Sequence, residues 1–450
     1  MCGIFAVYSQ EDTGIARKIF FALMALQHRG QEAAGIAVSD GRTINYKKDS
    51  GMVNQIFRER HLAKLPGRFG IGHTRYSTTK NKSGGRQPYQ FASKLGPFAI
   101  AHNGEITNYN KTKQKLLDKG VCFFTETDTE LLAHYIARTK KDTWEEALAD
   151  VIKEVPGAYS LVVLTNNEVW ALRDPLGMRL MCVGKKDNDW FIASESCCLN
   201  VVDATFVSDV EPGSLVKISK DGYSQRTVHQ YPRKTCAFEH VYFSRPDSQI
   251  DGMYVNEIRQ NIGEHLWGMT RKQFQPKNDY IVAGVPESAT PMAVGFANAS
   301  GIKYNEIFAK NRYIHRTFIK PIDTERKSAV YLKFNPLVNN ICGKKIILVD
   351  DSIVRGHTIR HLVQIVRKAG AKEIHILIGS PEIHHPCYMG IDMKSENEFI
   401  MNTFNPAELA MEIGADSITF LELDKLRDAI GKKGLCTACW TGEYPKELEW

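Results

Sequence analysis

Residues 345–368 read KIILVDDSIVRGHTIRHLVQIVRK, and this stretch decides the fold of the second half of the chain. Its apolar run predicts a buried strand, and the apolar residues at helical spacing after the glycine predict a helix. Further strand-like runs, DYIVAGVP at 279–286 and EIHILIGSP at 373–381, alternate with helical patterns such as NPAELAMEIGA at 405–415. This alternation predicts an α/β domain with a mostly parallel sheet, which places any small-molecule site at the carboxyl ends of the strands.

The first half of the chain has a different pattern. FAIAHNGEITNY, GAYSLVVLTNNEVWALRD and DWFIASES are apolar runs bounded by turn residues, and helical patterns occur at 15–30 and 126–140. Runs of strands without strict alternation predict an α+β domain with antiparallel sheets and helices packed on them. Because 450 residues are too many for one ordinary core, we expect two domains, residues 1–230 and 231–450.

The composition excludes several classes of protein. There are 58 Lys and Arg against 51 Asp and Glu, a net charge of +7, without a run of like charges typical of a nucleic-acid arm. The first residues, MCGIFAVYSQEDTG, lack the basic region of a secretory signal, and no apolar run reaches the roughly 18 residues of a membrane span. We therefore expect a cytoplasmic protein that binds neither nucleic acid nor membrane. Its ten cysteines are then core, catalytic or metal-binding residues rather than a disulfide framework.

Cys2 follows the initiator methionine. Removal of Met1 would give Cys2 a free α-amine, whose pKa near about 7.7–8.0 lets it accept the thiol proton at neutral pH. A cysteine at this position is usually chance, but the polar, glycine-rich stretches QHRGQEAAGIA, IGHTRYSTT, AHNGEITN and FTETDTE make a nucleophile the better interpretation.

The side chains in these stretches are complementary to one amino-acid ligand. Arg75 offers a planar fork for an α-carboxylate, and Asp128 accepts from an α-ammonium. Asn103 and the Gly104 N–H can form an oxyanion hole. Each also has a structural alternative: a surface ion pair for Arg75, a helix N-terminal charge for Asp128, and a type I′ turn at Asn103–Gly104.

The strings CGIFAVYS, HRGQEAAGI, GHTRYST, HNGEITN and TDTE resemble the glutaminase domain of the amino-terminal-nucleophile glutamine amidotransferases. The resemblance implies that Cys2 attacks the carboxamide of glutamine and that Asn103 and Gly104 hold the oxyanion. It assigns the remaining glutamine-binding roles to Arg75 and Asp128 for the α-groups, and to Arg29 and Thr78 for the pocket wall.

The sequence around Asp350 and Asp351 suits a phosphorylated sugar. A Ser/Gly/Thr loop before a helix presents N–H groups to a phosphate, whereas carboxylates suit ribose hydroxyls and Mg²⁺. VDDSIVRGHT resembles the phosphoribosyl pyrophosphate (PRPP) loop of type I phosphoribosyltransferases, and VDDSIVRG in particular that of the amidophosphoribosyltransferase family. By this resemblance the 5-phosphate is cradled by Ser352, Ile353, Val354, Arg355, Gly356, His357 and Thr358, although threonine is common where His357 stands.

Two other segments complete the expected PRPP site. In VAGVPESATPMAVGFA, the resemblance assigns Glu287 to the pyrophosphate side and Ser288 to Mg²⁺ together with Asp350 and Asp351, although the family usually has aspartate at position 287. The basic stretch 311–336 taken alone favours a solvated surface. By its place before the phosphate loop, this stretch resembles the family's mobile loop. Arg326 and Lys333 match basic positions of that loop, and Tyr331 stands where the family usually has another basic residue.

Cys436 and Cys439 form a CxxC pair, which is half of a four-ligand metal site. Cys236, in KTCAFEHVYFSRPDS, and Cys387, in HHPCYMGIDM, lie in strings that resemble the [4Fe–4S]-binding segments of the iron–sulfur subset of the family. Spacing alone favours zinc, and the surrounding strings favour iron–sulfur. We expect the other cysteines to be buried and inert: Cys122, Cys182, Cys197, Cys198 and Cys342.

Together the motifs imply glutamine hydrolysis coupled to amination of PRPP, the first step of purine synthesis in the family. The resemblance also implies a homotetramer inhibited by purine nucleotides. Two alternatives remain open: another amidotransferase with the same glutaminase half, and a non-catalytic PRPP sensor. The VDDSIVRGHT string argues against the first, and the joint presence of Cys2, Arg75, Asn103 and Asp128 argues against the second.

Overall fold

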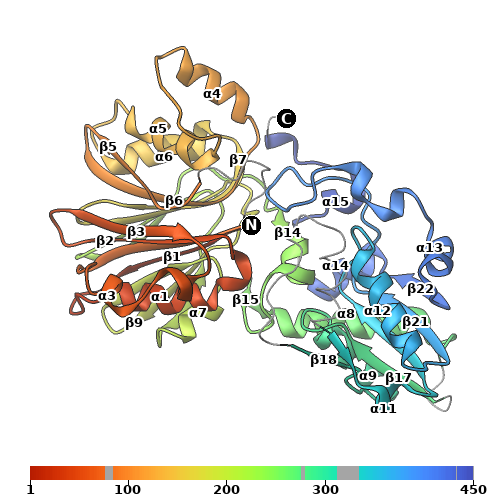
Figure 1. Ribbon diagram of the computed structural model, residues 1–450. Helices are drawn as coiled ribbons and strands as arrows, with labels where there is room; N and C mark the ends of the chain where they lie inside the picture. Colours follow the sequence, from red (N-terminus) through yellow and green to blue (C-terminus); the bar gives the residue numbers. More distant parts are fainter. Residues whose placement is uncertain (77–84, 275–278, 312–333, 432, 449–450) are drawn as a thin grey trace.

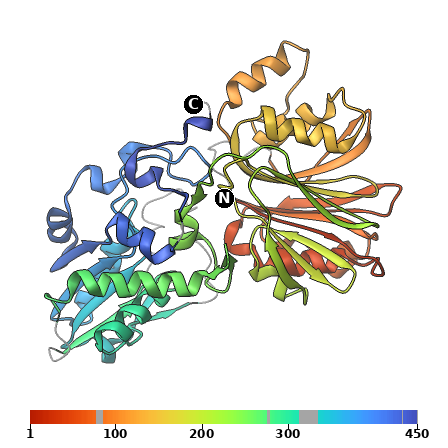
Figure 2. The same ribbon diagram turned by 180° about the vertical axis from the view of Figure 1, so that it is seen from behind.

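The structure is a computed structural model that describes residues 1–76, 85–274, 279–311, 334–431 and 433–448. Two halves of different architecture lie side by side, and the N-terminus lies between them in both views (Figures 1 and 2). The first half contains two antiparallel sheets, and the second contains one parallel sheet with helices on both faces.

Two stacked sheets form the centre of the first half. The seven-stranded sheet has the order β11 (Thr205–Asp209), β9 (Cys182–Lys186), β10 (Asp189–Ala193), β1 (Gly3–Tyr8), β4 (Phe69–Arg75), β2 (Ala33–Ser39) and β3 (Ile44–Ser50). The six-stranded sheet has the order β13 (Gly222–Thr227), β12 (Ser214–Ser219), β8 (Val169–Arg173), β7 (Gly157–Leu164), β6 (Gly96–Ile106) and β5 (Tyr89–Ser93).

Strand alternation explains why the sheets are layered. In β1, Ile4 and Ala6 pack into the core shared with the second sheet, whereas Phe5 and Val7 pack into the core under the helices. The first sheet is covered by α1 (Ala16–Ala25), α2 (Val53–Ile56) and α7 (Cys197–Asn200), and the second by α5 (Asp128–Ala137) and α6 (Trp144–Glu154). The other helical segments of this half are η1 (Gln27–Arg29), α3 (Glu59–Leu62) and α4 (Tyr109–Leu117).

The parallel sheet of the second half has the order β17 (Tyr280–Gly284), β20 (Lys345–Asp350), β21 (Glu373–Ile378) and β22 (Ser417–Phe420). Its strands are apolar on both faces because both are covered. One face packs on α8 (Val255–Thr270), α9 (Thr290–Ser300) and α14 (Leu423–Ile430), and the other on α12 (His357–Lys368) and α13 (Pro406–Ile413).

Short elements fill the boundary between the halves. The π-helix η2 (Glu239–Phe243) follows β14 (Thr235–Cys236), which pairs in parallel with β23 (Leu435–Cys436) before α15 (Ala438–Thr441). The remaining short elements are β15 (Gln249–Ile250), β16 (Met253–Tyr254), β18 (Phe308–Lys310), β19 (Phe334–Pro336), α11 (Val338–Ile341), η3 (Glu396–Glu398), η4 (Ile400–Asn402) and η5 (Lys446–Leu448).

The expected architecture, antiparallel sheets with helices followed by a parallel sheet, is confirmed. The division into residues 1–230 and 231–450 stays a prediction. The expectation that all the non-motif cysteines are buried is wrong for Cys122 and Cys342, which are exposed. In the part of the chain that the structure describes, no helix is long and apolar enough to cross a membrane.

Candidate active sites

Cys2 lies directly before β1, with its backbone and thiol facing different partners. Its N–H donates to Oδ1 of Asn103 at 2.9 Å, and its Sγ lies 3.7 Å from the carbonyl oxygen of Tyr76. The Asn103 side chain is fully buried, and its Nδ2 has no hydrogen-bond partner among the described residues. One end of this amide therefore orients residue 2, and the other end is a buried donor available to a ligand.

Asn103 and Gly104 lie within β6, opposite Ser160 and Tyr159 of β7. The alternative interpretation as a type I′ turn is therefore wrong. Gly104 has a φ of +148°, and a Cβ there would lie 2.0 Å from the carbonyl oxygen of Ala158. Only glycine fits this position, which keeps the strand close to its neighbour.

Arg75 and Asp128 are brought into one region by the residues that lead into β5, from Gly85 to Tyr89. A Cβ on Gly85 would lie 1.7 Å from Nη1 of Arg75, so the guanidinium packs directly over this glycine. The Gly85 N–H donates to the Tyr89 hydroxyl at 2.9 Å, and that hydroxyl lies 3.2 Å from Oγ1 of Thr127. Thr127 caps α5, whose first residue is Asp128.

Asp128 is a helix N-terminal residue, but its carboxylate also reaches β6. Its Oδ2 accepts from the N–H of Ile106 at 2.7 Å, which ties it to the strand of Asn103. Burial, with a smaller contribution from the Glu105 carboxylate, raises the pKa of Asp128 to about 7. A cationic group beside it would favour the ionised form, as the α-ammonium of an amino acid does.

Arg29 is fully buried behind Cys2. Its Nε donates to the Cys2 carbonyl oxygen at 3.0 Å, its Nη1 pairs with Glu195, and its Nη2 donates to Glu239 at 2.9 Å. Burial opposes its charge, but the Glu239 and Glu195 carboxylates outweigh burial and raise the Arg29 pKa. The guanidinium is thus engaged within the protein. Thr78, expected beside it in the pocket wall, lies outside the described residues.

The second site lies where β17 and β20 end side by side. Asp350 is the last residue of β20, and both Asp350 and Asp351 are buried. The hydroxyl of Ser288, from the loop after β17, donates to Asp351, as does that of Ser352 at 2.6 Å. Burial raises the pKa of Asp351. The structure therefore brings together Ser288 and Asp351, two of the three residues that the resemblance assigns to Mg²⁺.

The loop between β20 and α12 offers mainly backbone groups to a ligand. Gly356 caps α12 with a φ of +71°, and His357 is the exposed first residue of the helix. Ile353 is buried in the apolar core, so only its backbone is available to a ligand. Arg355 donates its Nε to Glu398 at 3.1 Å, and Glu287 pairs with Lys310 at 2.9 Å. Arg326 and Lys333 lie outside the described residues.

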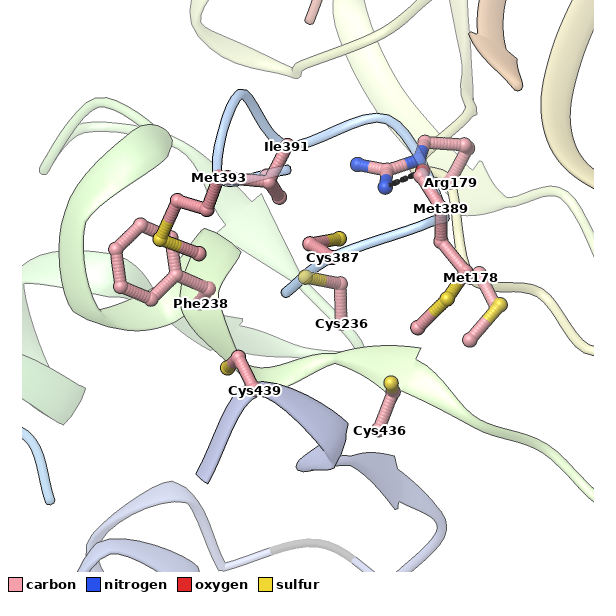
Figure 3. A pocket seen from close by; sticks show the side chains of 10 residues that line it. All are labelled: Met178, Arg179, Cys236, Phe238, Cys387, Met389, Ile391, Met393, Cys436 and Cys439. Atoms are coloured by element: carbon pink, nitrogen blue, oxygen red, sulfur yellow. Dashed lines mark hydrogen bonds between the residues drawn. The ribbon is translucent and has the colours of Figure 1, made fainter. Parts of the chain in front are cut away.

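The four motif cysteines line one cavity between the halves. Its wall consists of Cys236, Cys387, Cys436 and Cys439 together with Met178, Arg179, Phe238, Met389, Ile391 and Met393 (Figure 3). Segments some 200 residues apart therefore meet here. Among the described residues, however, no three histidine, cysteine or carboxylate side chains are arranged to hold a single metal ion.

Burial raises the pKa of the Cys236, Cys436 and Cys439 thiols and so keeps them protonated in the absence of a cation. It raises the pKa of Cys236 to about 12 and that of Cys436 to about 11, and neighbouring cysteines add to the effect in both. The rest of the wall is almost entirely apolar, apart from Arg179, whose Nη2 donates to the Met389 carbonyl oxygen.

Sequence reasoning missed three buried charges around Cys2: Arg179, Glu195 and Glu239. The only signal was a charged residue within an apolar run, as in CAFEHVYF around Glu239. Their partners come from distant segments, so spacing alone does not pair them.

Comparisons with known proteins find two different family profiles in separate parts of the chain. A family profile described as a glutamine amidotransferase domain matches residues 73–201, and one described as a phosphoribosyl transferase domain matches residues 254–379. The amidophosphoribosyltransferase of Methanocaldococcus jannaschii is 44% identical and covers 100% of this chain and 98% of its own. That of Bacillus subtilis is 39% identical, over 99% of this chain and 94% of its own.

A solved structure is equally similar. The B. subtilis glutamine PRPP amidotransferase, complexed with ADP and GMP, superposes with a TM-score of 0.90 at 38% identity, covering 99% of this chain and 97% of that one. Identity at this level over whole chains shows common descent and a common fold. The chain belongs to the amidophosphoribosyltransferase family, enzymes that use glutamine to aminate PRPP in purine biosynthesis.

Proposed function

We propose that this chain carries out its family's reaction with Cys2 as the nucleophile of glutamine hydrolysis. The observation that carries the proposal is the bond from the Cys2 N–H to Asn103, whose opposite amide end has no partner among the described residues. With Met1 removed, that nitrogen becomes an α-amine, which accepts the thiol proton. The thiolate attacks the carboxamide carbon, and the C–N bond breaks as the nitrogen takes this proton back from the α-amine and leaves as ammonia. Water then hydrolyses the thioester on Cys2 and releases glutamate.

Asn103 Nδ2 and the Gly104 N–H donate to the oxyanion in this proposal. Arg75 binds the α-carboxylate, and Asp128 binds the α-ammonium. The packing of Arg75 over Gly85 and the chain of contacts from Gly85 to Thr127 support their action on one ligand. Thr78 stays a candidate for the pocket wall. We assign Arg29 to holding Cys2 rather than to touching glutamine.

For the acceptor half, we propose that residues 352–358 bind the 5-phosphate of PRPP. Main-chain N–H groups before α12 and the helix N-terminus favour an anion. Arg355 and Glu287 contribute through their backbone, since their side chains pair with Glu398 and Lys310. Ammonia forms a bond to C1 of PRPP, the bond to pyrophosphate breaks, and the nitrogen loses a proton. Arg326 and Lys333 are proposed to contact the pyrophosphate.

Mg²⁺ fits the acceptor site by the chemistry of its donors. Asp350, Asp351 and Ser288 offer oxygen atoms, the ligands that Mg²⁺ prefers. The Ser288 and Ser352 hydroxyls both donate to Asp351 and so hold its carboxylate beside Asp350. When bound, the ion would neutralise charge on the pyrophosphate.

We propose that the cysteine cavity holds a [4Fe–4S] cluster. A single zinc needs its four sulfurs within about 2.3 Å of one point, an arrangement that the described cysteines lack. A cluster binds each thiolate to a different iron and so suits four cysteines spread around one cavity. The cluster would join the segment that carries Cys236, the loop that carries Cys387 and helix α15, and would so stabilise the packing of the two halves.

Regulation and assembly are proposed from the relatives. The B. subtilis enzyme was solved with ADP and GMP, which supports inhibition of this enzyme by purine nucleotides. We also propose a homotetramer in the cytoplasm, with domains at residues 1–230 and 231–450. The decisive assay is pyrophosphate release that depends on both glutamine and PRPP, measured with anaerobically purified protein. Absence of this activity would refute the proposal.

A further inference from the structure

The carbonyl and amide groups of Cys2 are held from opposite sides. Asn103 accepts from the N–H, and Arg29 Nε donates to the carbonyl oxygen at 3.0 Å. These two contacts define where the backbone of residue 2 lies. Any group that fixes the Arg29 guanidinium therefore also fixes the nucleophile.

The second half of the chain supplies one of the two carboxylates that fix Arg29. Glu195 comes from the first half, whereas Glu239 belongs to η2, after the linking strand β14. Glu239 is fully buried, its Oε1 accepts from Arg29 Nη2 at 2.9 Å, and its Oε2 accepts from Arg29 Nη1 at 3.2 Å. The paired geometry restricts the plane of the guanidinium, not only its position.

Glu239 is itself fixed by its surroundings. The Ser244 hydroxyl donates to its Oε2 at 2.8 Å. Arg259 of α8 donates Nε to the His240 carbonyl oxygen at 2.9 Å and Nη2 to that of Ser244 at 2.8 Å. The π-helix is thus anchored to a long helix of the second half, and Phe243 packs under Arg29 with its ring centroid 4.8 Å from Cζ. π-Helical turns of this kind are frequent at functional sites.

We propose that Glu239 is a positioning residue for the glutaminase reaction, acting through Arg29 on the backbone of Cys2. The proposal rests on the assignment of Cys2 as the nucleophile. It makes the glutaminase site incomplete without the second half of the chain, because a carboxylate from that half holds the nucleophile in register with its oxyanion hole. A displacement of the order of 1 Å at a reacting atom costs about 10²-fold in rate.

The test is Glu239→Gln, which keeps the shape of the side chain and removes its charge. We expect kcat for glutamine hydrolysis in the presence of PRPP to fall by about tenfold or more, with KM for glutamine within about twofold, since Glu239 lies behind the nucleophile. Synthesis from ammonium salt should be unchanged. The matched control is Glu211→Gln, which removes a boundary ion pair with Arg233 at 3.2 Å and does not contact Arg29. It should leave both activities unchanged.

A milder variant guards against misfolding of Glu239→Gln. Ser244→Ala deletes only the hydroxyl that holds Oε2, and we expect kcat for glutamine to fall by about twofold to fivefold. If Glu239 acts through Arg29, the Glu239→Gln change should have no further effect on kcat in an Arg29→Lys background. Unchanged glutamine kcat in soluble Glu239→Gln or Ser244→Ala protein, or fully additive losses in the double variant, would overturn the proposal. Glutamine-dependent activity in Cys2→Ala protein would instead refute the role of Cys2.

Discussion

The Nη2 atom of Arg29 lies 2.9 Å from Oε1 of Glu239, and neither side chain is exposed to solvent. The pair joins η1 of the first half to η2 of the second. Glu195 completes the group on the other side of the guanidinium. Glu195 also contacts His28, and Arg179 lies 3.8 Å from Glu239. Arg29 is nevertheless the cation that both buried carboxylates share, so its removal costs far more than losing a surface ion pair.

Arg29→Met should therefore destabilise the whole protein. Loss of the partner of a buried ion pair costs about 3–5 kcal/mol, which predicts a fall in melting temperature of roughly 10 °C. Arg17→Met is the matched control, because Arg17 pairs with Glu59 on the surface, and it should shift melting by no more than about 2 °C. Differential scanning fluorimetry measures the melting temperature of both variants, and an equal fall in the two would contradict this account.

The affinity for glutamine should depend on the protonation of Asp128. Its pKa is raised to about 7, so the free site is largely protonated at lower pH, and only the ionised carboxylate attracts the α-ammonium of glutamine. Affinity should rise by about tenfold per pH unit well below 7 and level off above it. Calorimetric titration of glutamine into Cys2→Ala protein between about pH 5.5 and 8 measures this without turnover.

Asp128→Asn provides the control for that titration. The variant should bind glutamine weakly at every pH, with a flat profile over the same range. A slope retained in Asp128→Asn protein would assign the titration to another group.

Replacing Asp350 and Asp351 together by Asn should damage the glutamine-dependent and the ammonia-dependent reactions alike. Both reactions need PRPP held at the ends of β17 and β20, where these carboxylates lie. Glutamine hydrolysis at Cys2 measured without PRPP should persist. Normal synthesis from ammonium salt in the double variant would remove the carboxylates from the mechanism.

Anaerobically purified protein should be brown and contain about four iron and four sulfide per chain. Cys436→Ala should lose both and be unstable, because four segments from the two halves line the cavity. Cys197→Ala is the matched control, since Cys197 is also buried but lies in the core under α1. Stoichiometric zinc, or no metal at all, would overturn the cluster assignment.

Local patterns predicted much of this molecule because they reflect local physics. The apolar run of β20 and the helical spacing of α12 are visible in residues 345–368. Ser288 was assigned to the site of Asp351 from the family resemblance, and the structure brings these two side chains together at the edge where β17 and β20 end. The ion pairs of Arg29 were not predictable. They depend on how β14 and η2 enter the boundary between the halves, and charge complementarity across some 200 residues leaves no periodic signal.

The central claim is that one chain carries two separable sites, with Cys2 serving only the first. The most direct measurement compares pyrophosphate release by Cys2→Ala protein, supplied with PRPP and either glutamine or a high concentration of ammonium salt, with that of the unaltered enzyme. The account predicts that the variant loses the glutamine-dependent reaction and keeps the ammonia-dependent one. Retained glutamine-dependent activity, or loss of both activities in folded protein, would contradict it.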